Sequence, residues 1–364
     1  MDWDMGLSSE VSVSIGLLER VCHGAVVGRS FDDASEIMKV HGMVELSAKH
    51  IRTLAEGEGR RLTKERDQQI DLYRDGQEAP PENAPDLLVI CADGGRVQTR
   101  QSDPMKRWKE DKIGVVYEGV VQPGQQADGE KYRGAKAKVK TYAATMESWE
   151  SFGWMLRLEA HRRGYERAKA KLFLSDGAQH ILEMQKFHFS DAVRILDWAH
   201  AAQHVADCAK AAFGEGTDKS GVWYAQHRQM LWDGKTTDLI RDIVKLSERA
   251  GSPKKDDTDG SPRKLLHQNA TSYFPNNKEA IDYPAFRAKG WPIGSGVAEG
   301  AVKQFAIRMK GSEKFWNGLE EEEPEDSLRT GAEEMLALYA LYASEDGRWQ
   351  RHWTQRAQPI RWQR

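Results

Sequence analysis

Short apolar runs that lead to an acidic residue mark the middle of the chain. Leu87–Ile90 leads to Asp93, and Ala170–Leu174 leads in the same way to Asp176. Runs of this length are typical of buried strands, and we expect the first strand to end at Asp93. A glycine follows each aspartate, which suits a turn but also lets a ligand approach the backbone. Each aspartate is therefore either a turn residue or part of a polar site at a strand end.

The pattern between these runs predicts a mixed sheet. Two further strands are expected over residues 108–119 and 136–144, followed by a helix over 148–169. Three strands, a helix and a fourth strand, with aspartates after the first and fourth strands, follow the order of an RNase H-like domain. The first and fourth strands of such a sheet are neighbours, so both carboxylates would meet at one edge.

Helical periodicity dominates the rest of the chain. It predicts helices over 31–41, from Ser47 onward, over 187–213 and 223–249, from about Val297, and over 327–343, whereas residues 1–30 carry little pattern. We therefore expect an α/β protein with five parts. These are a helix-turn-helix-like helical region (1–85), the first part of an RNase H-like domain (86–186), an α-helical insertion (187–285), the C-terminal helices of the RNase H-like domain (286–345) and a basic, Trp-rich tail (346–364). An independent helical domain is the alternative interpretation of the insertion.

The two N-terminal helices have the shape of a DNA-binding motif. Gly42 separates them, and the second would present Lys49, His50 and Arg52 near its start. A recognition helix contacts base edges and phosphates at this position. A helical hairpin with a solvated face is the alternative.

A third acidic residue, Glu299, is expected in the first turn of the helix that begins near Val297. Lys303 and Arg308 of this helix are predicted to point outward. A glutamate in a first turn also suits the helix dipole, which is the structural alternative. The preceding glycines do not have the spacing of a nucleotide-binding loop, so we expect no nucleotide cofactor.

Two histidines, His200 and His204, lie one helical turn apart. The pair lacks the glutamate that a zinc-protease helix carries next to its first histidine. We therefore favour a structural role over a zinc site.

Composition excludes several classes of protein. The 364 residues include three dispersed cysteines, which argues against a disulfide or zinc framework. No apolar stretch is long enough to span a membrane. The net charge of −3 gives no global basic field, but basic segments and 12 tryptophans suit stacking on bases or cation–π packing.

Four sequence motifs carry a family resemblance. They are ADGGRVQTR at Ala92–Arg100, SDGA at Ser175–Ala178, ILDWAH at Ile195–His200, and WPIGSGVAEGAVK with RMKGSEKFW within Trp291–Trp316. In this order they resemble bacterial insertion-sequence transposases of the DDE class, of the ISKra type and related to Mutator-like transposases. The resemblance implies a catalytic, metal-binding triad of Asp93, Asp176 and Glu299. It also implies an auxiliary motif of Asp197 and His200.

The chemistry of the residues agrees with this resemblance. Three carboxylates suit two Mg²⁺ or Mn²⁺ ions, which can activate a nucleophile and stabilise the leaving oxygen of a phosphodiester. We expect cleavage at transposon ends and 3′-OH strand transfer into target DNA. Our candidates for DNA contact are Lys49, His50, Arg52, Arg96, Lys136, Lys138, Lys303 and Arg308.

The expected partner is double-stranded DNA, bound by a homo-oligomer of a cytoplasmic, nucleoid-associated bacterial protein without membrane contact. Two other functions use the same residues. An RNase H-like nuclease or resolvase would cleave without strand transfer. An inactive transposase remnant would act as a DNA-binding protein.

Overall fold

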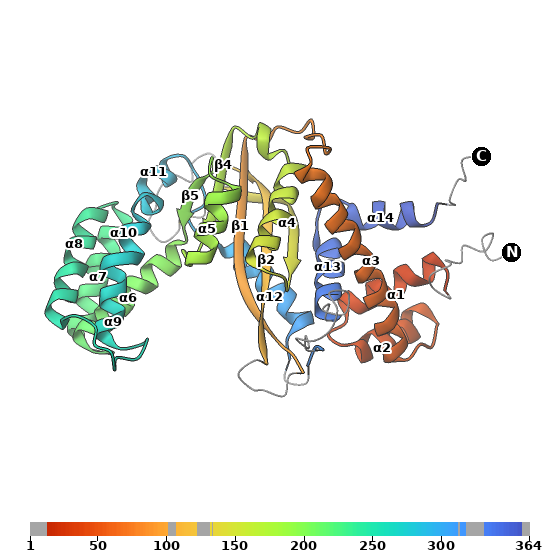
Figure 1. The fold of residues 1–364 in the computed structure, drawn as a ribbon, viewed down its shortest axis with the longest axis horizontal. Helices are drawn as coiled ribbons and strands as arrows, with labels where there is room; N and C mark the ends of the chain where they lie inside the picture. The colour runs from red at the N-terminus through yellow and green to blue at the C-terminus, as the bar shows by residue number, and fades with distance from the viewer. Residues whose placement is uncertain are drawn as a thin grey trace.

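A five-stranded sheet lies at the centre of the protein (Figure 1). The computed structural model describes residues 13–100, 107–121, 132, 134–311, 314–317 and 331–358. The strands are β1 (Leu87–Gln98), β2 (Trp108–Val120), β3 (Lys136–Thr145), β4 (Ala170–Ser175) and β5 (Val193–Leu196). Their order across the sheet is β3-β2-β1-β4-β5.

The sheet is mixed. β2 runs antiparallel to both β1 and β3, whereas β4 runs parallel to both β1 and β5. β1 and β4 pair from Leu87 opposite Ala170 to Cys91 opposite Leu174. The first and fourth strands are therefore neighbours, as the sequence predicted.

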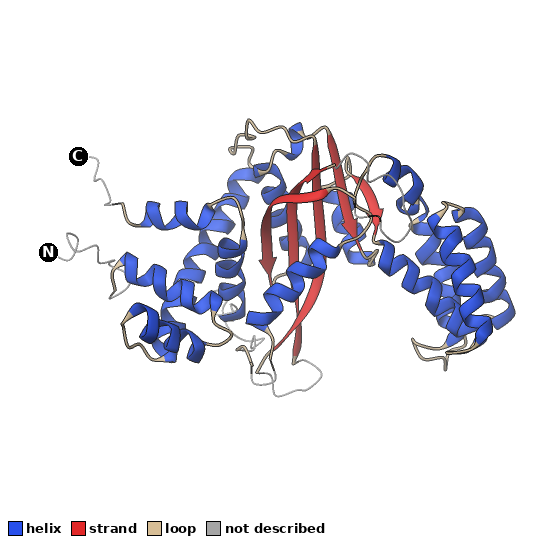
Figure 2. Cartoon of the chain, turned by 180° about the vertical axis from the view of Figure 1, so that it is seen from behind, coloured by secondary structure: helices blue, strands red, loops and turns tan. Residues whose placement is uncertain are grey.

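Helices cover both faces of the sheet because successive residues of β1 point to opposite sides. Leu88 and Ile90 pack in a cluster with residues of α4 (Trp149–Arg162) and α5 (Gln179–His188). Val89 and Cys91 belong to the larger core, which includes α12 (Gly296–Met309) and α13 (Gly331–Ala343). Figure 2 shows a helix crossing the sheet on this second side.

One end of the molecule is built from helices at both ends of the chain (Figure 1). They are α1 (Ile15–Val27), α2 (Phe31–Gly42), α3 (Ala48–Arg74), α13 and α14 (Arg348–Arg356). The expected start of α3 is confirmed, because the Ser47 hydroxyl caps it by accepting from the His50 amide at 3.2 Å. α1 is an addition to the prediction, since the sequence pattern of residues 1–30 is weak.

The opposite end is helical and follows β5 (Figure 1). It consists of α6 (Trp198–Phe213), α7 (Asp218–Trp232), α8 (Thr236–Ala250), α9 (Pro262–Gln268), a π-helical turn (Asn269–Tyr273), α10 (Phe274–Asn276), a 3-10 turn (Lys278–Ile281) and α11 (Tyr283–Ala288). Another 3-10 turn, Tyr165–Arg167, precedes β4. Among the described residues, no helix combines the length and apolar character needed to cross a membrane.

Three expected element boundaries are wrong. The single helix expected over 223–249 is broken after Trp232, so that α7 and α8 are separate helices. β1 does not end at Asp93 but continues to Gln98, because β2 pairs with it along this whole length. The continuous helix expected over 187–213 is interrupted by β5, which pairs with β4 and joins the sheet. Asp197 separates this strand from α6, since its side chain caps the helix.

The tail is also more structured than expected. Its first part forms α14, in which Trp349 and Trp353 are buried in the core rather than displayed for stacking. Trp316 is buried as well, and its indole N–H donates to the carbonyl oxygen of Met309 at 2.9 Å. An acidic run at 320–326 (EEEEPED), residues 327–330 of the helix expected over 327–343, and residues 359–364 of the tail lie outside the described residues.

Candidate active site

Asp93 lies on β1 just past the last residue that pairs with β4. It shares a strand face with Cys91 and Val97, and both belong to the core on the side of α12. One carboxylate oxygen of Asp93 accepts from the Gly94 amide at 2.8 Å. The strand therefore directs the Asp93 carboxyl group toward the side of the sheet that carries α12.

Asp176 follows β4 directly. Its Oδ1 atom accepts from the Ala178 amide at 2.9 Å. Gly177 has a φ of 86° and lies close to Leu196, so that a Cβ atom there would be 2.6 Å from the Leu196 Cδ1 atom. The turn after β4 thus requires glycine, and this turn fixes the position of Asp176.

Glu299 occupies the first turn of α12, as the sequence predicted. The ammonium of Lys303, one turn later, is 3.6 Å from the Glu299 carboxylate. Because α12 packs on β1 and β2, its first turn brings Glu299 toward the aspartates.

The pKa of Asp93 is shifted by its surroundings. Burial raises this pKa above its ordinary value of 3.8, and the hydrogen bond from the Gly94 amide opposes the rise. The negative charges of Asp176 and Glu299 raise it further, whereas His200 lowers it. The fold therefore places three acidic groups and one histidine within electrostatic reach of each other.

Asp197 and His200 lie beside Glu299. Potential ligand atoms of these three side chains are all within 4.8 Å of one another. Carboxylate oxygens and an imidazole nitrogen suit a divalent cation, so this donor set could hold one. It shares only Glu299 with the predicted triad, and among the described residues Asp93 and Asp176 are not part of it.

Asp197 also has a structural role. It is almost completely buried, and its Oδ1 atom accepts from the His200 amide at 2.8 Å. Its Oδ2 atom accepts from the amide of Ser295, at the entrance to α12. This carboxylate therefore joins the start of α6 to the start of α12, the helix that carries Glu299.

Tyr273 contacts Asp176, and His204 in turn contacts Tyr273; neither is among the site residues predicted from the sequence. The Tyr273 hydroxyl donates to the Asp176 carbonyl oxygen at 3.3 Å. The His204 ring stacks on Tyr273 with 3.5 Å between ring centroids, and its Nδ1 atom is 2.8 Å from the Asn269 side-chain oxygen. Burial lowers the pKa of His204. The structural role favoured for His204 agrees with this packing, whereas no sequence pattern pointed to Tyr273.

The predicted DNA-contacting residues fall into different environments. Lys49, Arg96, Lys136 and Lys138 are exposed, and the Lys303 side chain is 78% exposed. His50 is half-buried. The Arg52 guanidinium is bound to Glu56 at 2.7 Å.

The expectation for Arg308 is wrong. Its side chain points inward and is buried, and its Nε–H donates to the Ala25 carbonyl oxygen at 2.7 Å. The guanidinium lies 4.3 Å from the ring centroid of Phe31, and burial lowers the pKa of Arg308 to about 10. The N-terminal helices cover this side of α12, so Arg308 connects two parts of the fold instead of facing DNA.

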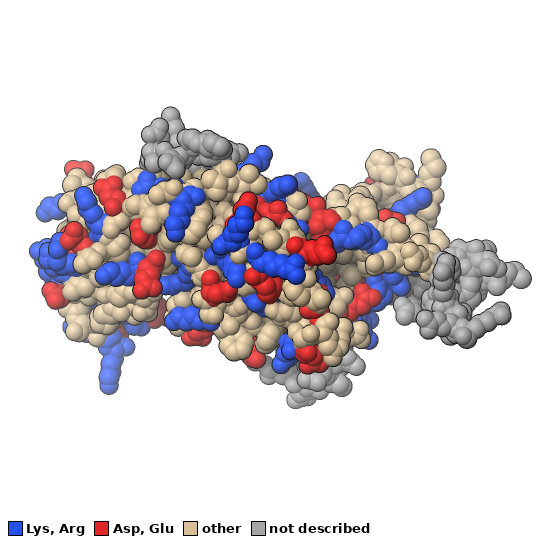
Figure 3. Space-filling model, turned by 90° about the horizontal axis from the view of Figure 1, so that it is seen from above, with Lys and Arg blue, Asp and Glu red and all other residues tan. Residues whose placement is uncertain are grey.

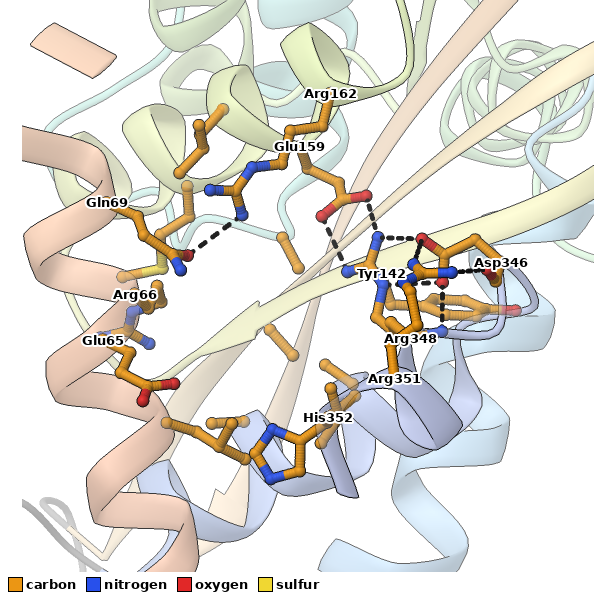
Figure 4. Close-up of a pocket in the computed structure, with 18 of the residues that line it drawn as sticks. Glu65, Arg66, Gln69, Tyr142, Glu159, Arg162, Asp346, Arg348, Arg351 and His352 are labelled. Atoms are coloured by element: carbon orange, nitrogen blue, oxygen red, sulfur yellow. Dashed lines mark hydrogen bonds and ion pairs between the residues drawn. The ribbon is translucent and has the colours of Figure 1, made fainter. Parts of the chain in front are cut away.

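A polar cavity of about 470 Å³ lies away from these carboxylates, between α3, α4, β3 and α14 (Figure 4). Arg348 binds both Glu159 oxygens, at 2.6 and 3.0 Å, and also binds Asp346. Arg162 donates to Gln69 at 3.1 Å. Because these groups satisfy one another, we assign the cavity a structural role in joining the helices to the sheet.

Surface charge is mixed on the face seen from above, where basic and acidic side chains are interspersed (Figure 3). This agrees with the small net charge of the chain. An extended field of one sign does not cover this face. Any DNA contact there would depend on individual side chains.

Comparison with known proteins found a weak structural similarity. The chain matches no family model and no curated protein. It is similar to one chain of the Drosophila P element transposase strand transfer complex, over 93% of this chain and 94% of that chain, with 10% sequence identity and a TM-score of 0.35.

Proposed function

We propose that this protein is a DNA transposase of the DDE class with an RNase H-like catalytic domain. It would cleave DNA at transposon ends and join the 3′-OH to target DNA. One observation carries the proposal. Asp93 and Asp176 lie near the point where two adjacent parallel strands separate, and α12, which carries Glu299 in its first turn, packs on one of these strands.

The carboxylates of Asp93, Asp176 and Glu299 would hold two Mg²⁺ or Mn²⁺ ions, with His200 available as a further ligand. Such ions, when bound, supply Lewis-acid stabilisation of the phosphate oxygens. The chain's own residues orient the carboxylates and offer one cation to the DNA. The Gly94 and Ala178 amides orient two carboxylates, Asp197 fixes the entrance to α12, and the exposed Lys303 ammonium is available to a phosphate.

Cleavage of DNA fragments taken from the sequence on either side of the gene tests this function. The variants Asp93→Asn, Asp176→Asn and Glu299→Gln should each reduce Mg²⁺- or Mn²⁺-dependent cleavage at least about 100-fold, because a metal site contributes several kcal/mol to the transition state. Asp86→Asn is the matched control, since Asp86 is an exposed carboxylate bound to Lys169 at the surface. Unchanged cleavage by all three variants would refute the proposed site.

The products separate the remaining alternatives. Cleavage followed by joining of 3′-ends to a target plasmid supports the transposase. Cleavage without joining supports a nuclease or resolvase. Binding of the repeats without metal-dependent cleavage supports a DNA-binding remnant.

A further inference from the structure

A π-helical turn, Asn269–Tyr273, lies between α9 and α10 in the helical end of the molecule. The Phe274 amide donates to the Asn269 carbonyl oxygen, five residues earlier, so this turn is wider than an α-helical one. π-Helical turns are rare and often occur at functional sites. The last residue of this turn, Tyr273, contacts Asp176, which is one of the three predicted metal ligands.

His204 of α6 packs against both ends of the π-helical turn. Its ring stacks on the Tyr273 ring with 3.5 Å between centroids and 12° between the ring planes. Its Nδ1 atom is 2.8 Å from the side-chain oxygen of Asn269, which is buried and donates through Nδ2–H to the Leu265 carbonyl oxygen at 2.9 Å. The first helix after the sheet therefore holds the Tyr273 ring in one orientation.

Tyr273 in turn lies against the turn that carries Asp176. Its hydroxyl donates to the Asp176 carbonyl oxygen at 3.3 Å. A Cβ atom at Gly177 would be 3.5 Å from the Tyr273 ring and 3.4 Å from the Asn277 Nδ2 atom. Asn277 is buried, donates to the Tyr273 carbonyl oxygen at 2.7 Å and accepts from Arg194 of β5 at 2.6 Å. Buried polar contacts thus join the π-helical turn both to the end of β4 and to β5.

We infer that the π-helical turn sets the position of Asp176 for metal binding, with Tyr273 and His204 as its positioning residues. This inference rests on the part of the proposed function in which Asp176 is a metal ligand. The Ala178 amide orients the Asp176 carboxylate, and the Tyr273 hydroxyl holds the main chain of the same residue. Because Mg²⁺ requires nearly ideal ligand geometry, a displaced main chain at Asp176 would weaken its binding.

Binding of Mn²⁺ alone to the full chain tests the inference without DNA, since electron paramagnetic resonance measures the free ion. Asp176→Asn should weaken Mn²⁺ binding at least about tenfold, because loss of a ligand costs at least as much as loss of the groups that orient it. Tyr273→Phe should weaken it at least about threefold, within the range that one hydrogen bond contributes, with little change in the urea midpoint. Wild-type Mn²⁺ affinity in folded Tyr273→Phe would overturn the inference.

Two variants of His204 separate positioning from support of the fold. His204→Ala removes the ring on which Tyr273 packs and should weaken Mn²⁺ binding about as much as Tyr273→Phe does. His204→Phe keeps a flat ring but loses the contact with Asn269, so it should recover most of the Mn²⁺ affinity while its stability in urea stays below that of the wild type. Wild-type affinity in His204→Ala, or weak binding in folded His204→Phe, would overturn the role of His204. If His204→Ala does not fold, Tyr273→Phe still decides.

Tyr165→Phe is the matched control. Tyr165 is buried on the other side of the sheet, and its hydroxyl donates to the Asp191 carboxylate. The control should therefore bind Mn²⁺ as the wild type does. Weaker binding would show that loss of any buried tyrosine hydroxyl loosens the metal site, and would overturn the inference.

The two proposals fail separately. Weaker Mn²⁺ binding in both Asp176→Asn and Tyr273→Phe, in a protein that never cleaves DNA, would refute the proposed function but support the inference. Cleavage that depends on the three carboxylates, with wild-type Mn²⁺ affinity in Tyr273→Phe, would refute only the inference. Unchanged Mn²⁺ affinity in Asp176→Asn would remove Asp176 from the metal site and overturn the inference.

Discussion

Glu58 provides a quantitative test of how the two ends of the chain are joined. It lies on α3, is only 3% exposed, and accepts hydrogen bonds from Arg61 on the same helix. His352 and Arg356 of α14 approach it at 2.8 and 3.1 Å. Glu58→Gln keeps the shape of the side chain but removes the charge that these groups surround.

The expected magnitude follows from the pKa of Glu58. Burial alone would raise this pKa, but the hydrogen bonds from His352 and Arg61 and the charges of Arg61 and Arg356 outweigh it and lower the pKa from 4.5 to about 2. At 1.36 kcal/mol for each pH unit, the ionised carboxylate contributes about 3 kcal/mol to the free energy of unfolding. A lowered carboxylate pKa makes this contribution complete above about pH 4.5, and it is lost as the pH falls toward 2.

Urea denaturation at pH 7 and pH 3 measures this contribution. Glu58→Gln should lower the free energy of unfolding by about 3 kcal/mol at pH 7 and by less than half of that at pH 3. Glu345→Gln is the matched control, because its partly exposed ion pair with Lys140 should contribute no more than about 1 kcal/mol. Equal stability of Glu58→Gln and the wild type at pH 7 would show that the reasoning is wrong.

Three further substitutions test contacts in the fold and the site. Asp197→Asn leaves one acceptor oxygen for two amides, so unfolding should become easier by about 1–3 kcal/mol, and undiminished stability in urea would argue against the bridge to α12. Gly59→Ala would put a methyl group 2.3 Å from the Glu334 carbonyl oxygen and should cost about 1–3 kcal/mol or more, whereas Gly57→Ala on the same helix has open space and should be neutral or stabilising in the same thermal melts. Tyr273→Phe removes the hydrogen bond to the Asp176 carbonyl oxygen and should slow metal-dependent cleavage while changing stability by no more than about 1 kcal/mol, so an unchanged cleavage rate would leave Tyr273 without a positioning role.

Much of the sheet could be predicted because most of its strands can be recognised from the local sequence. β2 and β4 contain apolar runs of strand length. A capping serine, Ser47, marks the start of α3. β5 escaped prediction because it is only four residues long and is flanked by helices. Its pairing with β4, and not its own periodicity, makes it a strand.

The candidate site also combines residues predicted from the sequence with contacts found only in the structure. The sequence alone singled out Asp93, Asp176 and Glu299, and their catalytic roles stay predictions. Only the tertiary structure decided that Asp197 joins α6 to α12 and that Tyr273 contacts Asp176. These relations connect residues far apart in the chain, and local pattern carries no information about such contacts.

Arg308 shows most clearly why the local sequence does not predict which charges are exposed. Its position in the sequence of α12 predicts an outward charge, yet the N-terminal helices supply a carbonyl oxygen and an aromatic ring that accommodate it inside. Periodicity tells which residues of a helix share a face. The neighbours that cover each face are chosen by packing of the whole chain, and packing therefore decided which charges of this protein meet solvent.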